Sequence, residues 1–163
     1  MATETVHASA VVKAKPEAIY EAWLDGARHA AMTGGAAKSD GRVGQPFTAW
    51  DGYIRGKHLE LQPARRIVQA WRTTEFPDSA PDSRIFVVLD PEAGGTRVTI
   101  VHTDIPKGQG SSYESGWEKH YFAPMRSYFA KAATKKPIAT KKAAAKKPAA
   151  KKAAAKRPVK KKR

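Results

Sequence analysis

Basic side chains crowd the end of the chain in a pattern suited to binding a polyanion. All 15 acidic side chains and half of the 30 basic ones precede position 131, so the net charge of +15 lies on residues 131–163. Such a run can neutralise successive phosphates of a nucleic acid. The predicted nucleic-acid-binding residues are Lys135, Lys136, Lys141, Lys142, Lys146, Lys147, Lys151, Lys152, Lys156, Arg157, Lys160, Lys161, Lys162 and Arg163.

The spacing of these residues favours non-specific, electrostatic DNA binding. Basic doublets recur every five or six residues, with alanine between them and proline at 137, 148 and 158. A step of five residues turns about 140° around a helix, so the cations would spread around its axis and present no base-reading face. The segment consists almost entirely of small and basic residues, so it has too little apolar surface to fold and is predicted to be a disordered tail. It resembles the C-terminal tails of linker histones. Binding to an anionic membrane, or a solubilising role, is the alternative, although no aromatic membrane anchor lies among the lysines.

Polar residues that could support acid–base chemistry are scattered along the predicted strands. They are His58, Glu60, Arg72, His102 and Asp104. No Ser–His–Asp order, carboxylate pair or histidine-rich metal spacing accompanies them. The chain has no cysteine, which excludes thiolate metal ligands and a cysteine nucleophile. We therefore expect no catalytic residue, no metal, no cofactor and a protein that is not an enzyme.

Large aromatic residues could line an apolar pocket or simply fill a core. Strand alternation does not distinguish a packed core from a hollow one, so both interpretations stay open. The cavity candidates are Trp50, Tyr53, Trp71, Phe86, His102, Trp117 and Tyr121.

The elements that must position these residues follow from hydrophobic periodicity and turn residues. We expect one strand at 5–13, followed by two helices at 16–25 and 27–32. Five further strands come next, and a long aromatic helix at 111–130 ends the domain. Pro124 should kink or split this last helix. The five strands are expected at 46–51, 53–61, 66–74, 84–90 and 96–103. This order predicts an α+β fold in which a curved antiparallel sheet packs on the C-terminal helix. Residues 1–130 form the domain and 131–163 the basic tail.

Several motifs in this domain resemble a known family. They are the run at 47–56 followed by Leu59-Glu60-Leu61, the run at 66–72, the strand at 95–103, and Gly116-Trp117 with Tyr121 and Pro124. Together they resemble the C-terminal-type domain of activators of the heat-shock-protein-90 ATPase, within the START-like (SRPBCC, helix-grip) superfamily. The resemblance implies the helix-grip fold, with a cavity between the sheet and the long helix.

We expect a non-enzymatic START-like domain tethered to nucleic acid, cytoplasmic and associated with the nucleoid. Neither a signal peptide nor a membrane span is evident in the sequence, so we expect no membrane partner. Two alternatives remain: a co-chaperone that stimulates a heat-shock-protein-90-type ATPase, as the resemblance implies, and a carrier or sensor of a small apolar ligand.

Overall fold

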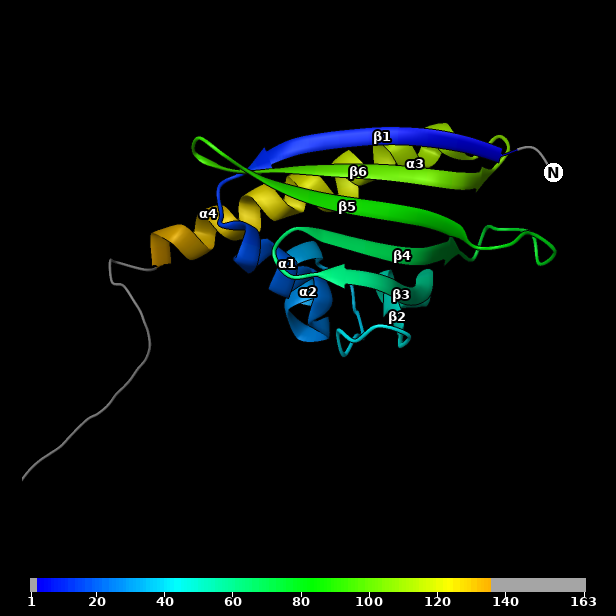
Figure 1. Ribbon diagram of the computed structural model, residues 1–163, viewed down its shortest axis with the longest axis horizontal. Helices are drawn as coiled ribbons and strands as arrows, with labels where there is room; N and C mark the ends of the chain where they lie inside the picture. Colours follow the sequence, from blue (N-terminus) through cyan, green and yellow to red (C-terminus); the bar gives the residue numbers. More distant parts are fainter. Residues whose placement is uncertain (1–2, 136–163) are drawn as a thin grey trace, which may run out of the picture. The chain divides into compact units, whose positions relative to one another are not determined.

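Six antiparallel strands form one sheet in this computed structural model, which describes residues 3–135 (Figure 1). Their order across the sheet is β1-β6-β5-β4-β3-β2, so only β1 pairs with a strand distant in sequence. The predicted α+β fold with an antiparallel sheet is therefore confirmed. The strands are β1 (Thr3–Val12), β2 (Pro46–Ala49), β3 (Ile54–Gln62), β4 (Arg66–Thr73), β5 (Ser83–Glu92) and β6 (Gly95–Pro106).

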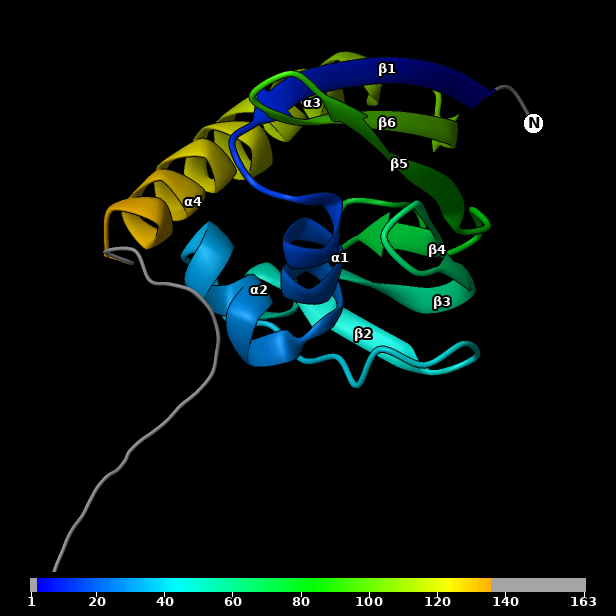
Figure 2. The same ribbon diagram turned by 60° about the vertical axis from the view of Figure 1, so that its left-hand side comes forward.

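Two short helices, α1 (Pro16–Leu24) and α2 (Gly26–Thr33), connect β1 to β2. Pro16 occupies the first turn of α1, where its missing N–H leaves no helical bond unmade. The Asp25 carboxylate accepts a hydrogen bond from the Arg28 backbone N–H at 2.9 Å and so caps α2. Gly34, with φ of 93°, ends α2 in the left-handed conformation that glycine adopts without strain. Figure 2 shows the pair beside the β2–β3 end of the sheet.

Side chains alternate between the two faces of the sheet, as the strand pattern predicts. In β6, Val98, Ile100 and His102 point inward and are fully buried, whereas Thr99 and Val101 are only partly buried. In β5 the inward residues are Ile85, Val87 and Leu89.

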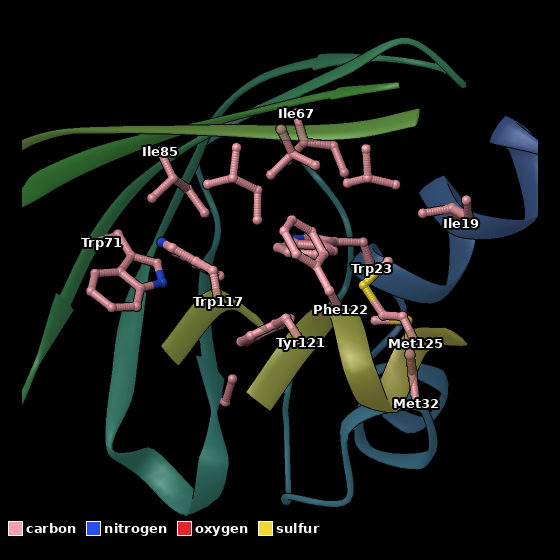
Figure 3. Close-up of a cluster of buried hydrophobic side chains, with 14 of the residues drawn as sticks. Ile19, Trp23, Met32, Ile67, Trp71, Ile85, Trp117, Tyr121, Phe122 and Met125 are labelled. Atoms are coloured by element: carbon pink, nitrogen blue, oxygen red, sulfur yellow. The ribbon is translucent and has the colours of Figure 1, made fainter. Parts of the chain in front are cut away.

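The core lies between this inner face and the helices. Figure 3 shows Ile67 and Ile85 from the sheet facing Phe122 and Met125 from the C-terminal helical segment, with Ile19 of α1 at one side. All five side chains are at most 1% exposed. Their burial is the main hydrophobic stabilisation of the fold.

The C-terminal helical segment is continuous but irregular. It comprises α3 (Gly110–Trp117), a π-helical turn (Glu118–Phe122) and α4 (Ala123–Lys135), and the compact unit of the chain ends at Phe129. Pro124 has no N–H to donate and would crowd the carbonyl four residues earlier, which lies within the π turn. The predicted disturbance thus takes the form of a wider turn, and the helix does not split. Within residues 3–135, no helix is long and apolar enough to cross a membrane.

The structure departs from the predicted 46–51 strand at its end. Strand β2 stops at Ala49, and residues Trp50–Gly52 form a 3₁₀ turn in which Trp50 and Asp51 have φ values of 51° and 59°. Positive φ is uncommon for residues with a side chain and marks a locally strained backbone. This turn directs Trp50 toward the C-terminal helical segment, where its ring lies 5.3 Å from that of His120.

Candidate functional site

A cavity of about 490 Å³ lies between the start of β3 and the α3–π segment. This volume falls in the range of small-molecule sites. Its aromatic lining residues are Trp50, Tyr53, Trp71, Tyr113, Trp117 and Tyr121, and we call it the aromatic cavity. The other lining residues are Ile54, Ser112, Ser115, Gly116, Lys119 and His120.

Three rings stand together at the inner side of the aromatic cavity. The Trp117 ring centre lies 5.5 Å from that of Trp71 and 5.0 Å from that of Tyr121. Figure 3 shows Trp71 coming from the sheet and the other two from the helical segment. All three are 3% exposed, so most of their surface packs against protein. The rings are tilted against one another, and Trp23 packs on both Trp117 and Tyr121, so together they form the closed floor of the cavity.

His102 lies behind two of these rings and does not line the aromatic cavity. Its ring centre is 4.6 Å from that of Trp71, and its Nε2 lies 2.8 Å from the Ser83 hydroxyl. Because the Ser83 hydroxyl donates to the Trp71 carbonyl, it accepts from His102, which therefore carries its proton on Nε2. Burial lowers the pKa of His102 to about 3, so the ring is neutral at physiological pH.

A second polar chain begins at Tyr121. Its hydroxyl lies 3.0 Å from His29 Nε2, and His29 Nδ1 donates to the Trp23 carbonyl at 2.8 Å. Since Nδ1 carries the proton, Nε2 accepts from the tyrosine. Burial lowers the pKa of His29, with the Trp23 carbonyl opposing it, and burial raises the pKa of Tyr121. The pair is a neutral structural hydrogen bond.

A polar rim surrounds the hydroxyls of Tyr53 and Tyr113. Tyr53 donates to the Glu75 carboxylate at 2.7 Å, and burial, followed by this hydrogen bond, raises the pKa of Tyr53 to about 12. The Tyr113 hydroxyl lies 2.6 Å from the Thr73 hydroxyl and donates to the Gln109 side chain at 2.7 Å. Both phenols are thus held in place by protein partners.

Trp50 lines the aromatic cavity from the 3₁₀ turn between β2 and β3. An added Cβ at Gly35 would lie 2.5 Å from the Trp50 indole, so this packing requires glycine. The Trp50 Nε1–H is buried without a hydrogen-bond partner among the described residues. Trp50 is therefore held by ring packing and backbone conformation, not by a polar anchor.

The structure brings five of the seven predicted cavity residues together: Trp50, Tyr53, Trp71, Trp117 and Tyr121. Phe86 is a correction, because it alternates with the buried Ile85 and Val87 and so lies on the outer face of the sheet. There its ring is 5.4 Å from the Arg66 guanidinium.

Sequence reasoning missed seven of the twelve lining residues, of which Tyr113, Gly116 and Lys119 bear most on the shape and charge of the cavity. Tyr113 could have been found, because it lies one helical turn before Trp117 on the same face. Nothing in the local pattern marks the other two.

The polar residues considered for acid–base chemistry do not form one site. Glu60 forms an ion pair with Arg66 at 3.9 Å, and Arg72 forms one with Asp82 at 2.8 Å. The Asp104 carboxylate accepts a hydrogen bond from the neighbouring Thr103 hydroxyl. His58 is buried and bonded to Ser39 and Gln69. Burial lowers the pKa of His58, with Asp40 opposing it. In residues 3–135, no group of three His, Asp or Glu residues could hold a metal ion.

The predicted nucleic-acid-binding residues from 136 to 163 lie outside the described residues. Lys135 is the last residue of α4.

A curved antiparallel sheet packed on a C-terminal helix, with an aromatic cavity between them, defines a START-like helix-grip domain. Residues 13–130 match the family model described as Activator of Hsp90 ATPase homolog 1-like protein, and the chain belongs to that family. This confirms the resemblance seen in the sequence.

Named relatives and solved structures agree with this assignment. The chain is 25% identical over 118 residues to human Activator of 90 kDa heat shock protein ATPase homolog 1, covering 72% of this chain and 35% of that protein. The homologue from Dictyostelium discoideum is 23% identical over 129 residues, covering 78% and 33% respectively. The chain thus spans about a third of the length of these relatives.

Among solved structures, an HSP90 activator from Plasmodium falciparum, PFC0360w, superposes with a TM-score of 0.71 at 19% identity, over 77% of this chain and 96% of that chain. Protein CV1439 from Chromobacterium violaceum superposes with a TM-score of 0.60 at 29% identity, over 76% and 95%. These likenesses establish the fold.

Proposed function

We propose that this protein is a non-enzymatic binding module with two parts: a START-like domain that holds a small, mostly apolar ligand, and a basic segment that attaches it to nucleic acid. The observation that carries the first part is the 490 Å³ aromatic cavity. Six aromatic residues supply apolar surface there, while the nearby tyrosine hydroxyls already have protein partners.

Native mass spectrometry of full-length protein tests the ligand part. We expect a bound small molecule, or uptake of added aromatic compounds, that the Gly116→Leu variant loses because leucine fills the cavity. An added Cβ at Gly116 meets only His120, at 3.8 Å, so the backbone tolerates a side chain there. Full occupancy in Gly116→Leu, or no uptake by wild type, would contradict the proposal.

The segregated charge supports the nucleic-acid part. The domain up to residue 130 has equal numbers of acidic and basic side chains, and residues 131–163 carry the whole +15. A cationic segment without acidic residues gains affinity by releasing counterions from nucleic acid. We infer non-specific binding through this segment, which would place the domain on DNA in the nucleoid.

Titration of duplex DNA at about 50–300 mM salt tests this second part. Full-length protein should bind with a log–log salt slope of about −7 if eight phosphates are neutralised. A truncation after Lys135 keeps all of α4 and should not bind. Equal binding by both proteins, or by neither, would refute attachment through this segment.

A second candidate function is stimulation of a heat-shock-protein-90-type ATPase, which the names of the human and Dictyostelium relatives favour. The steady-state ATPase rate of the chaperone from the same organism should rise with added protein. An unchanged rate at saturating protein would remove this candidate.

A further inference from the structure

The charges around the aromatic cavity are one-sided. Lys119 lines it with a positive charge, and no acidic residue of the described chain does so. The Lys119 side chain is exposed and makes no hydrogen bond or ion pair within residues 3–135. By contrast, the adjacent Glu118 forms an ion pair with Arg126. An exposed ammonium group at a cavity wall is available to an anionic ligand group.

The lining residues at the two ends of the helical segment have different electrostatic surroundings. Tyr113 lies near one end, beside Tyr53, whose hydroxyl bonds to Glu75. Lys119 lies six positions later, and this separation corresponds to about 9 Å of helix. The Glu75 carboxylate would repel an anion at the tyrosine end, so the anionic group belongs at the Lys119 end.

The walls between these ends suit flat rings. Trp50 and Tyr53 are the more exposed aromatic residues of the lining, and stacked or edge contacts of a ligand ring with them add to simple apolar burial. Only Gly116 and two serines interrupt the helical wall with small residues, and this leaves room for a ring between helix and sheet.

We propose that the aromatic cavity binds an aromatic acid of two or three rings, with its carboxylate or sulfonate on the Lys119 ammonium group. This inference rests on the proposed ligand-binding function and names its ligand class. The rings would lie against Trp50, and the acid would point to solvent beside Lys119. A partly exposed ion pair of this kind should give a preference of about fivefold over a neutral ring system.

Two fluorescent probes with the same ring system test this. The probe 8-anilinonaphthalene-1-sulfonate carries an anionic group that N-phenyl-1-naphthylamine lacks. Full-length protein should bind the sulfonate about fivefold more tightly than the neutral amine. Lys119→Gln should abolish the difference without weakening the amine, and Lys119→Arg should retain it. Because the sulfonate could also bind the basic segment, only the signal that Gly116→Leu removes is assigned to the cavity.

The possible outcomes distinguish failure of the acid preference from failure of ligand binding in the cavity. If neither probe gives a signal sensitive to Gly116→Leu, ligand binding in the cavity is itself refuted. If both probes bind there equally, or Lys119→Gln weakens both alike, the acid preference is overturned and cavity binding stands. Circular dichroism of each variant checks folding, and the exposed position of Lys119 makes its substitution a surface change.

Discussion

Trp117 Nε1 lies 3.4 Å from His102 Nδ1, so a wall of the aromatic cavity donates its N–H to a fully buried histidine of the sheet. The arrangement holds only while His102 is neutral, because protonation of Nδ1 would set two N–H donors against each other. The orientation of the Trp117 indole is thereby linked to the protonation state of a residue that no ligand touches.

Acid should destabilise the domain through this histidine. Unfolded His102 takes up a proton near its ordinary pKa of 6.5, whereas the folded residue resists protonation until about pH 3. The unfolded state therefore binds more protons in this window, and the free energy of unfolding should fall as pH drops, by up to about 1.4 kcal/mol per pH unit.

Urea unfolding of wild type and His102→Gln between pH 7 and 4 measures this contribution. The variant should be less stable at pH 7, because glutamine cannot replace both hydrogen bonds, but its stability should fall less steeply. Carboxylates titrate equally in both proteins, so parallel stability curves would show that His102 does not contribute.

Substitution of alanine for each of two glycines near the cavity should change the stability of the domain in opposite directions. At Gly116 an added Cβ meets only the His120 ring at 3.8 Å, so Gly116→Ala should stabilise helix α3 by about 0.5–1 kcal/mol. At Gly35 the same atom would lie 2.5 Å from the Trp50 indole, and Gly35→Ala should destabilise the fold by about 1–3 kcal/mol. Thermal unfolding of both variants provides the comparison, and a melting temperature that rises for Gly35→Ala would disprove the packing described.

Removal of the Tyr121 hydroxyl should leave His29 Nε2 buried without a donor. Tyr121→Phe should therefore cost about 1–3 kcal/mol in chemical unfolding, although the ring and its packing remain. Tyr128→Phe serves as a matched control, because Tyr128 is only partly buried and should change stability little. Equal costs for the two variants would argue against the Tyr121–His29 hydrogen bond.

Phe86 and Trp71 should differ in both stability and probe binding. Trp71→Ala removes a core side chain that is 3% exposed and should cost about 3–5 kcal/mol while weakening naphthylamine binding. Phe86→Ala alters the outer face of the sheet and should leave the probe affinity unchanged within about twofold. A loss of probe affinity in Phe86→Ala would show that Phe86 lines the cavity after all.

Much of the fold could be predicted because its signals are local. The strict alternation in β6 marks Val98, Ile100 and His102 as one face, and Pro16 marks the start of a helix. The cavity could be predicted less well. A one-residue step along β5 separates the inner Ile85 from the outer Phe86, and the size of the phenyl ring does not reveal which face is inward. The place of the Trp50 ring against Gly35 is likewise a contact between residues distant in sequence, which no local pattern predicts.

The π turn has a consequence for how this protein compares with its relatives. A π turn holds about one residue more than an α-helical turn, and one residue corresponds to about 100° of rotation. Trp117 and Met125 are eight residues apart, which would separate them by about 80° around a regular α-helix, and the wider turn between them reduces this angle. The segment thus holds one more residue in this turn than a regular helix would, while Trp117 of the cavity and Met125 of the core both stay buried on the side toward the sheet. A homologue that lacks the turn should be aligned with a one-residue gap between positions 118 and 122.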